Sequence, residues 1–170
     1  MLKFSLQRAL LLVLFKCAIV SALGNAAAAG FSTQTQADQE KHEQWLREKF
    51  AHQHEQLTPI VAVADMFFAC NQERTPDNEQ YSVRFMVEVM NKNVLAQKLS
   101  QCLGEDGLGS EVAVNYGLLG CFTEQLNGLP EEEKAAKLKL VKTAINNLSI
   151  EERKKSLTQC VTDQAINYLK

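Results

Sequence analysis

Apolar residues recur along most of the chain at the spacing of a helix that buries one face. Near the C-terminus, apolar residues recur at spacings of three and four, at Leu157, at the adjacent pair Cys160 and Val161, and at Ala165 and Tyr168. Such intervals place side chains on one face of an α-helix. The alternation of apolar and polar residues that is typical of strands is nearly absent. The sequence therefore predicts an all-α fold.

Helix-start signals divide this pattern into segments. Thr58-Pro59 and Thr75-Pro76 each offer an N-cap hydroxyl followed by proline at the first helical position. Pro130 precedes three glutamates, which suit the positive end of a helix dipole, and Ser149-Ile150-Glu151-Glu152 has the spacing of a capping box. About seven helices are predicted, over residues 36–56, 59–71, 76–91, 94–103, 110–127, 130–147 and 150–169.

The segment from Ile60 to Cys70 is apolar at every position except Asp65. This pattern is typical of a helix that is covered on most sides, so we expect it to be central. A buried carboxylate with a raised pKa is a candidate functional group. The alternative is an aspartate at the edge of the core or one that a neighbour caps. No histidine follows in the chain to complete an acid–base pair, and we predict that the protein is not an enzyme.

Two cysteine-bearing segments resemble each other. Val61-Ala62-Val63 leads to Cys70, and Val112-Ala113-Val114 leads to Cys121, 51 residues further on. Leu99-Ser100-Gln101-Cys102 is likewise repeated as Leu157-Thr158-Gln159-Cys160 at an offset of 58. Glycines between residues 104 and 109 would break the helix between the copies. We expect an internal duplication of a three-helix unit, with copies at about 58–104 and 109–165; chance similarity of amphipathic helices is the alternative.

The four downstream cysteines predict disulfides. If each copy runs down, up and down, its two cysteines lie toward the same end, which favours Cys70 with Cys102 and Cys121 with Cys160. Four cysteines allow three pairings, so Cys102 with Cys121 stays open. An even number of cysteines in an exported chain favours disulfides over thiol chemistry.

The first 29 residues have the layout of a secretory signal peptide. Lys3 and Arg8 precede an unbroken apolar run, and small residues follow up to Ala29, the expected cleavage position; Ala22 is the alternative. Lys16 within the apolar stretch disfavours a membrane span, because a charge at mid-helix costs about 2.5–3.5 kcal/mol. We therefore expect a secreted or periplasmic protein with a polar segment at 30–57, carrying one helix, and the duplicated domain at 58–170.

Charge changes the list of partners. Without the leader the chain keeps 15 basic and 20 acidic residues. This acidic balance disfavours nucleic acid as a partner, and we predict none. The chain has no glycine-rich phosphate loop after a strand and no paired cysteine spacing for a metal, and we predict no cofactor.

The segment before residue 57 holds all three histidines, at positions 42, 52 and 54. On a helix, residues two apart point in nearly opposite directions, so His52 and His54 cannot readily share an ion, and no metal site is predicted. The apolar stripe of Trp45, Leu46 and Phe50 has two interpretations. It docks on the core, or it forms a surface that binds a protein partner.

The methionine and aromatic content suggests a different surface. Flexible methionines and large rings can line a cavity for an apolar molecule. The candidate lining is Met66, Phe67, Phe68, Phe85, Met86, Met90, Tyr116 and Phe122. Ordinary core packing explains the same residues. The leading hypothesis is an exported, non-enzymatic carrier of an apolar small molecule in a helical bundle; the alternative is a protein-binding module, such as a periplasmic inhibitor, immunity factor or chaperone, that acts through an exposed helical face.

Overall fold

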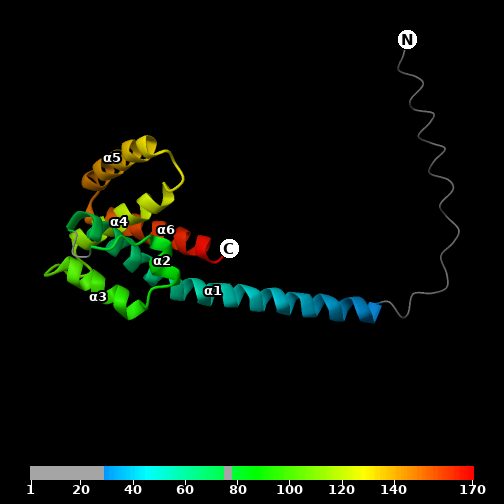
Figure 1. Ribbon diagram of the computed structural model, residues 1–170. Helices are drawn as coiled ribbons and strands as arrows, with labels where there is room; N and C mark the ends of the chain where they lie inside the picture. The colour runs from blue at the N-terminus through cyan, green and yellow to red at the C-terminus, as the bar shows by residue number, and fades with distance from the viewer. Residues whose placement is uncertain (1–28, 75–77) are drawn as a thin grey trace, which may run out of the picture. The chain divides into compact units, whose positions relative to one another are not determined.

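The computed structural model describes residues 29–74 and 78–170, with side chains from residue 36 onward (Figure 1). All secondary structure in this part of the chain is helical. The helices are α1 (Ala29–Arg74), α2 (Val83–Glu88), α3 (Lys92–Leu103), α4 (Glu111–Gln125), α5 (Glu131–Asn147) and α6 (Ile150–Tyr168). The predicted leader, apart from its last residue, and the start signal at Thr75-Pro76 lie outside the described residues.

The described chain divides into two units, of which the first ends at Trp45 and the second spans residues 46–170. Within the first unit, the ring of His42 stacks on Trp45 at 5.9 Å. The second unit contains α2 to α6, the later part of α1 and both disulfides. A search of the described helices finds none with the length and apolar content needed to cross a membrane.

The break predicted at Thr58-Pro59 is absent, and the segments expected at 36–56 and 59–71 form the single helix α1. The hydroxyl of Thr58 does not cap a new helix. It donates to the carbonyl oxygen of His54, one turn earlier, at 2.8 Å. Pro59 removes one backbone donor, and a helix of 46 residues retains enough other hydrogen bonds to continue through it.

The helix expected at 76–91 is also shorter than predicted. Residues 78–82 are not helical, and α2 begins only at Val83, where the hydroxyl of Ser82 accepts from the backbone N–H of Phe85 at 3.2 Å. The amide of Asn71 donates to the carbonyl of Glu79 at 3.0 Å and holds the preceding segment against α1. The remaining four helices agree with the predicted ranges to within two residues at each end.

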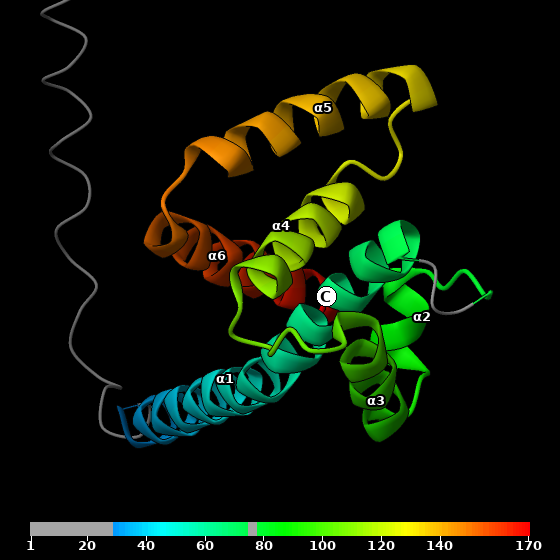
Figure 2. The ribbon, with the colours of Figure 1, turned by 90° about the vertical axis from the view of Figure 1, so that its left-hand side faces the viewer.

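The core of residues 46–170 is built from buried side chains of α1, α2, α3, α4 and α6. In both ribbon views α5 and α3 lie on opposite sides of α4 (Figures 1 and 2). Most of α5 is exposed, and Ile145 is its one fully buried side chain. The largest side chains that are less than 2 % exposed include Phe67, Met86, Leu95, Leu99, Leu103 and Leu118.

Two disulfides frame this core. Cys70–Cys102 joins the last turns of α1 and α3, and Cys121–Cys160 joins α4 to α6. This is the pairing that the sequence favoured. Each bond closes a loop of more than 30 residues, which contributes about 3–4 kcal/mol in the chain-entropy model.

Helices α1 and α4 approach each other most closely at Gly120. A Cβ atom added at Gly120 would lie 2.1 Å from the carbonyl oxygen of Asp65, which belongs to the α1 backbone. One turn earlier, a Cβ at Gly117 would meet the methyl groups of Leu157 at 2.9 and 3.0 Å and Met66 at 3.2 Å. The Leu157 and Met66 contacts are flexible side-chain atoms, whereas the backbone at Asp65 cannot yield without moving α1. Glycine is therefore required at position 120 by the helix crossing.

We predict that Gly120→Ala destabilises the protein by about 1–3 kcal/mol, the usual cost of overpacking, despite the higher helix propensity of alanine. Gly107→Ala is the control, because a Cβ there meets nothing within 4 Å. Urea unfolding followed by circular dichroism measures both variants. A Gly120→Ala protein as stable as the Gly107→Ala protein would contradict the close crossing.

Candidate functional site

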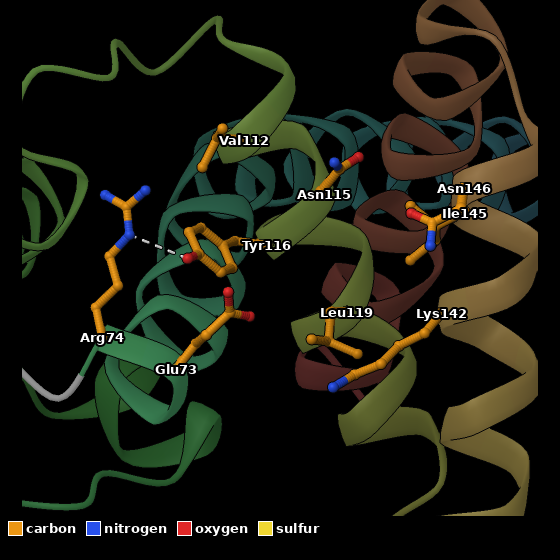
Figure 3. Close-up of a pocket in the computed structure, with 9 residues that line it drawn as sticks. All are labelled: Glu73, Arg74, Val112, Asn115, Tyr116, Leu119, Lys142, Ile145 and Asn146. Carbon is orange, nitrogen blue, oxygen red and sulfur yellow. Dashed lines mark hydrogen bonds between the residues drawn. The ribbon is translucent and has the colours of Figure 1, made fainter.

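A cleft of about 370 Å³ lies between three helices of the second unit (Figure 3). Its wall from α4 follows helical periodicity, with residues at intervals of three and four, and its wall from α5 does the same. The lining residues are Glu73 and Arg74 from α1, Val112, Asn115, Tyr116 and Leu119 from α4, and Lys142, Ile145 and Asn146 from α5. The cleft therefore combines apolar side chains with several polar ones.

Tyr116 forms the wall of the cleft on the α1 side. Its side chain is buried, and its hydroxyl accepts a hydrogen bond from Nε of Arg74 at 3.1 Å. The guanidinium carbon also lies 5.5 Å from the centre of the ring. Burial raises the pKa of Tyr116 above its ordinary value, and the nearby charge of Glu73 adds to this rise. The tyrosine is thus a neutral and well-oriented wall.

Arg74 uses its donors within the protein. One terminal nitrogen donates to the carbonyl oxygens of Cys102 and Leu103 at 3.0 and 2.9 Å, and the other donates to Asp106 at 2.9 Å. These two carbonyls belong to the last turn of α3, where a helix leaves acceptors without internal partners. Arg74 therefore caps α3 and positions Tyr116, and it is not available as the cation that binds a ligand.

Asn115 is oriented by α6. A terminal nitrogen of Arg153 donates to its Oδ1 at 3.1 Å, and Nε of the same arginine donates to the carbonyl of Leu148 at 2.9 Å. Because Oδ1 accepts, the amide nitrogen of Asn115 is left as a donor at the cleft. One arginine thus fixes both this amide and the connection from α5 to α6.

Two opposite charges face the cleft. Glu73 lies on the α1 wall of the cleft. Lys142 extends from α5 past Leu119, and its ammonium points toward the α1 wall (Figure 3). Within the described part of the chain, Lys142 has no carboxylate at ion-pair distance. The two charges therefore do not neutralise each other directly.

The eight residues predicted to line an apolar cavity do not gather around this cleft. Tyr116 lines it, while Phe122 lines a separate groove beside Cys160. Phe67 and Met86 are each 1 % exposed and pack in the core. Met66 is buried, Phe68 and Met90 are half-buried, and Phe85 is 42 % exposed and stacks on Tyr81.

The stripe proposed for a partner is exposed at each residue. Trp45 is 52 % exposed in the first unit, and Leu46 and Phe50 are 48 % and 42 % exposed in the second. The ring of Phe50 stacks on His54, whose Nε2 donates to the carbonyl of Thr162 on α6 at 3.1 Å. The assignment of this stripe to a protein partner stays a prediction. Among the described residues, no three His, Cys, Asp or Glu side chains are placed to hold a metal ion.

Asp65 is fully buried rather than at the edge of the core. Its Oδ1 accepts from Nε2 of Gln164 at 3.2 Å, and its Oδ2 has no hydrogen-bond partner in the described structure. The other end of the Gln164 amide lies 2.9 Å from Sγ of Cys121, which carries no hydrogen because it is in a disulfide. Burial, with a smaller contribution from the charge of Glu124, raises the pKa of Asp65 well above its ordinary value. Asp65 does not line the cleft.

Most of the polar cleft residues were missed by the sequence analysis. Asn115 offered a signal, because it is a lone amide within the apolar run from Val112 to Cys121. Neither Glu73 nor Lys142 offered a signal, since each belongs to a polar, charged stretch whose pattern predicts a solvent-exposed surface. Only the packing of α1 and α5 against α4 places these charges at one cleft.

We predict that Phe67→Ala lowers the free energy of unfolding by about 3–5 kcal/mol, because its ring is buried in the core. Phe85→Ala makes the same chemical change at a ring that is 42 % exposed, and it should cost clearly less. Urea unfolding compares the two variants. Equal losses would show that Phe85 packs as tightly as Phe67.

Asp65→Asn tests the buried carboxyl through its pH dependence. Because the pKa of Asp65 is raised on folding, the folded state holds its proton where the unfolded state has lost it. Stability is therefore lost as the pH rises from about 4 toward neutrality. We expect Asp65→Asn to remove most of this loss, so that the variant gains stability on the wild type at pH 7. Unfolding curves at pH 4 to 8 measure it, with Asp163→Asn, an exposed aspartate of α6, as the control.

Comparisons with known proteins offer no guide to this cleft. No protein-family model matches the chain, no curated protein matches it, and no solved structure matches it either.

Proposed function

We propose that the protein is an exported, non-enzymatic binding protein that holds a small amphipathic molecule in the cleft between α1, α4 and α5. The observation that carries this proposal is one cleft of about 370 Å³ with both apolar walls and polar groups. Small-molecule sites commonly have volumes of about 300–1,000 Å³ and combine apolar surface with a few polar groups that fix orientation.

An amphipathic ligand suits the lining better than the wholly apolar one that the sequence suggested. Val112, Leu119 and Ile145 supply apolar contacts, but Lys142 and Asn115 face the same space. A ligand without polar groups would bury these two side chains without forming a hydrogen bond to either. Burial of polar groups without hydrogen bonds costs free energy. A ligand with a polar end would satisfy them.

The composition of the cleft supports binding rather than nucleophilic catalysis. Its lining residues include no histidine, serine, threonine or cysteine. The hydroxyl of Tyr116 accepts from Arg74, and the pKa of this tyrosine is raised, chiefly by burial. A group in this state is a poor nucleophile at neutral pH.

Export is supported by the leader-like pattern of residues 1–29 and by the disulfides. Two intramolecular disulfides are compatible with an extracellular or other oxidising compartment. We place the mature protein outside the cytoplasm on this basis, secreted or periplasmic, without a cofactor.

We also propose that the helical domain arose by internal duplication. Each disulfide joins the first and third helix of one predicted copy, α1 to α3 and α4 to α6. The bonded cysteines are 32 and 39 residues apart. The middle helices differ most, since α2 has 6 residues and α5 has 17. The cleft uses the longer one, so the proposed site belongs to the second copy and the end of α1.

Titration with 8-anilinonaphthalene-1-sulfonate, which carries apolar rings and an anionic group, tests the binding role. We expect saturable binding to the wild type and at least a tenfold loss of affinity in Leu119→Trp, because the indole would fill the cleft. Leu140→Trp adds the same side chain on α5 at a residue that is 70 % exposed and outside the lining, and it should bind normally. Equal affinities of the two variants, or no saturable binding to the wild type, would contradict the proposal.

A further inference from the structure

We infer that the cleft takes a zwitterionic ligand, a short peptide with free termini and an apolar side chain, whose amino group meets Glu73 and whose carboxylate meets Lys142. This inference rests on the proposed binding function and specifies its ligand class. It depends on the placement of the two charges, on the lack of any other free cation in the lining, and on the apolar surface between them.

The two charges of the cleft are separated. Glu73 lies on α1 and Lys142 on α5, and the structure forms no ion pair between them. Two other lysines of α5 have partners outside the cleft, since Lys137 pairs with Glu133 at 3.3 Å and Lys134 donates to Asn127 at 2.8 Å. Lys142 is distinguished from them by standing over the cleft. A ligand with two opposite charges would pair with both groups at once, and the Glu73 carboxylate also interacts with the Tyr116 hydroxyl.

Arg74, the other cation of the lining, is engaged within the protein. Its guanidinium is directed past Tyr116, away from Lys142 (Figure 3), and it is bonded to Tyr116, the end of α3 and Asp106. The carboxylate of a ligand therefore has one free ammonium to bind, that of Lys142. The amide nitrogen of Asn115 is a second donor, since its Oδ1 is taken by Arg153.

The lining also supplies apolar surface for the part of a ligand between its two charged ends. Val112 and Leu119 lie on α4 at an interval of seven residues, so they share one face, and Ile145 lies on the α5 wall. The ring of Tyr116 adds a flat apolar surface beside Glu73. This surface suits an aliphatic side chain. A volume of about 370 Å³ has room for a dipeptide of such residues.

The two ends give different chemical specificity. Charge-assisted hydrogen bonds are stronger than neutral ones, so each terminus should contribute separately to affinity. Acetylation of the amino group removes the charge that Glu73 would bind. Amidation of the carboxylate removes the charge that Lys142 would bind. The ligand's chemistry can thus be matched to one protein residue at a time.

The experiment is isothermal titration calorimetry of the full mature chain with L-leucyl-L-leucine, its N-acetyl form and its C-terminal amide. We expect each modification to weaken binding at least tenfold. In Glu73→Gln the unmodified and acetylated peptides should bind alike, and in Lys142→Gln the unmodified and amidated peptides should bind alike. Glu133→Gln and Lys137→Gln remove the same charges from α5 outside the cleft lining and should keep the wild-type preferences.

Where peptides do bind, two results would overturn the inference. The first is equal binding of all three peptides to the wild type, and the second is retention of the wild-type preferences in both cleft variants. If no peptide binds but the anilinonaphthalene probe binds in a way that Leu119→Trp abolishes, the zwitterion inference fails and the binding function stands. If neither the peptides nor the probe binds, both fail. Circular dichroism of each variant confirms that the helical fold is retained.

Discussion

The close crossing of α1 and α4 is the contact on which the rest of the second unit depends. At Gly120 the two backbones approach so closely that no side chain fits between them. From this point, α1 continues to Glu73 and Arg74, while α4 runs back toward Tyr116. The crossing therefore brings the end of α1 beside the α4 face that lines the cleft. It also encloses Asp65. The carbonyl of this residue forms the contact, and one of its two carboxyl oxygens, Oδ2, has no hydrogen-bond partner in the described core.

Covalent and polar bonds hold the neighbouring helices around this crossing. The Cys70–Cys102 bond and Arg74 act at the same place, since both join the last turn of α1 to the last turn of α3. Cys121–Cys160 joins α4 to α6 next to Gly120. Each disulfide limits the unfolded chain, whereas Arg74 satisfies carbonyl groups that the end of α3 leaves open. The orientation of Tyr116 in the cleft follows from the same arginine.

The features that the sequence predicted are those that a few neighbouring residues decide. The capping box at Ser149 forms as expected, with its hydroxyl accepting from the backbone of Glu152, and α5 begins directly after Pro130. The predicted helix break at Pro59 is wrong. The hydroxyl of Thr58 donates to the carbonyl of His54 instead of capping a new helix, and the Thr-Pro pair alone does not distinguish these two arrangements. The short α2 likewise depends on Ser82 and on a tertiary bond from Asn71.

The site was less predictable than the helices, for a physical reason. Periodicity identifies which face of a helix is buried, and Phe67 and Met86 are indeed in the core. It carries no information on whether facing helices leave volume between them. The cleft is formed by residues from three helices. Its charged residues belong to stretches whose sequence pattern predicts solvent exposure. Asn115 alone stood out, as a polar residue within an apolar run.

The anchoring of α5 links the cleft to the stability of its own wall. This helix has one fully buried side chain, Ile145, and half-buried contacts at Leu138 and Val141, so little apolar surface holds it to α4. Elements with few buried contacts open at low free-energy cost. A zwitterion bound at both Glu73 and Lys142 would connect α5 to α1 directly. Because a ligand stabilises the state that it binds, occupancy of the proposed site would order the helix that the protein's own core holds least.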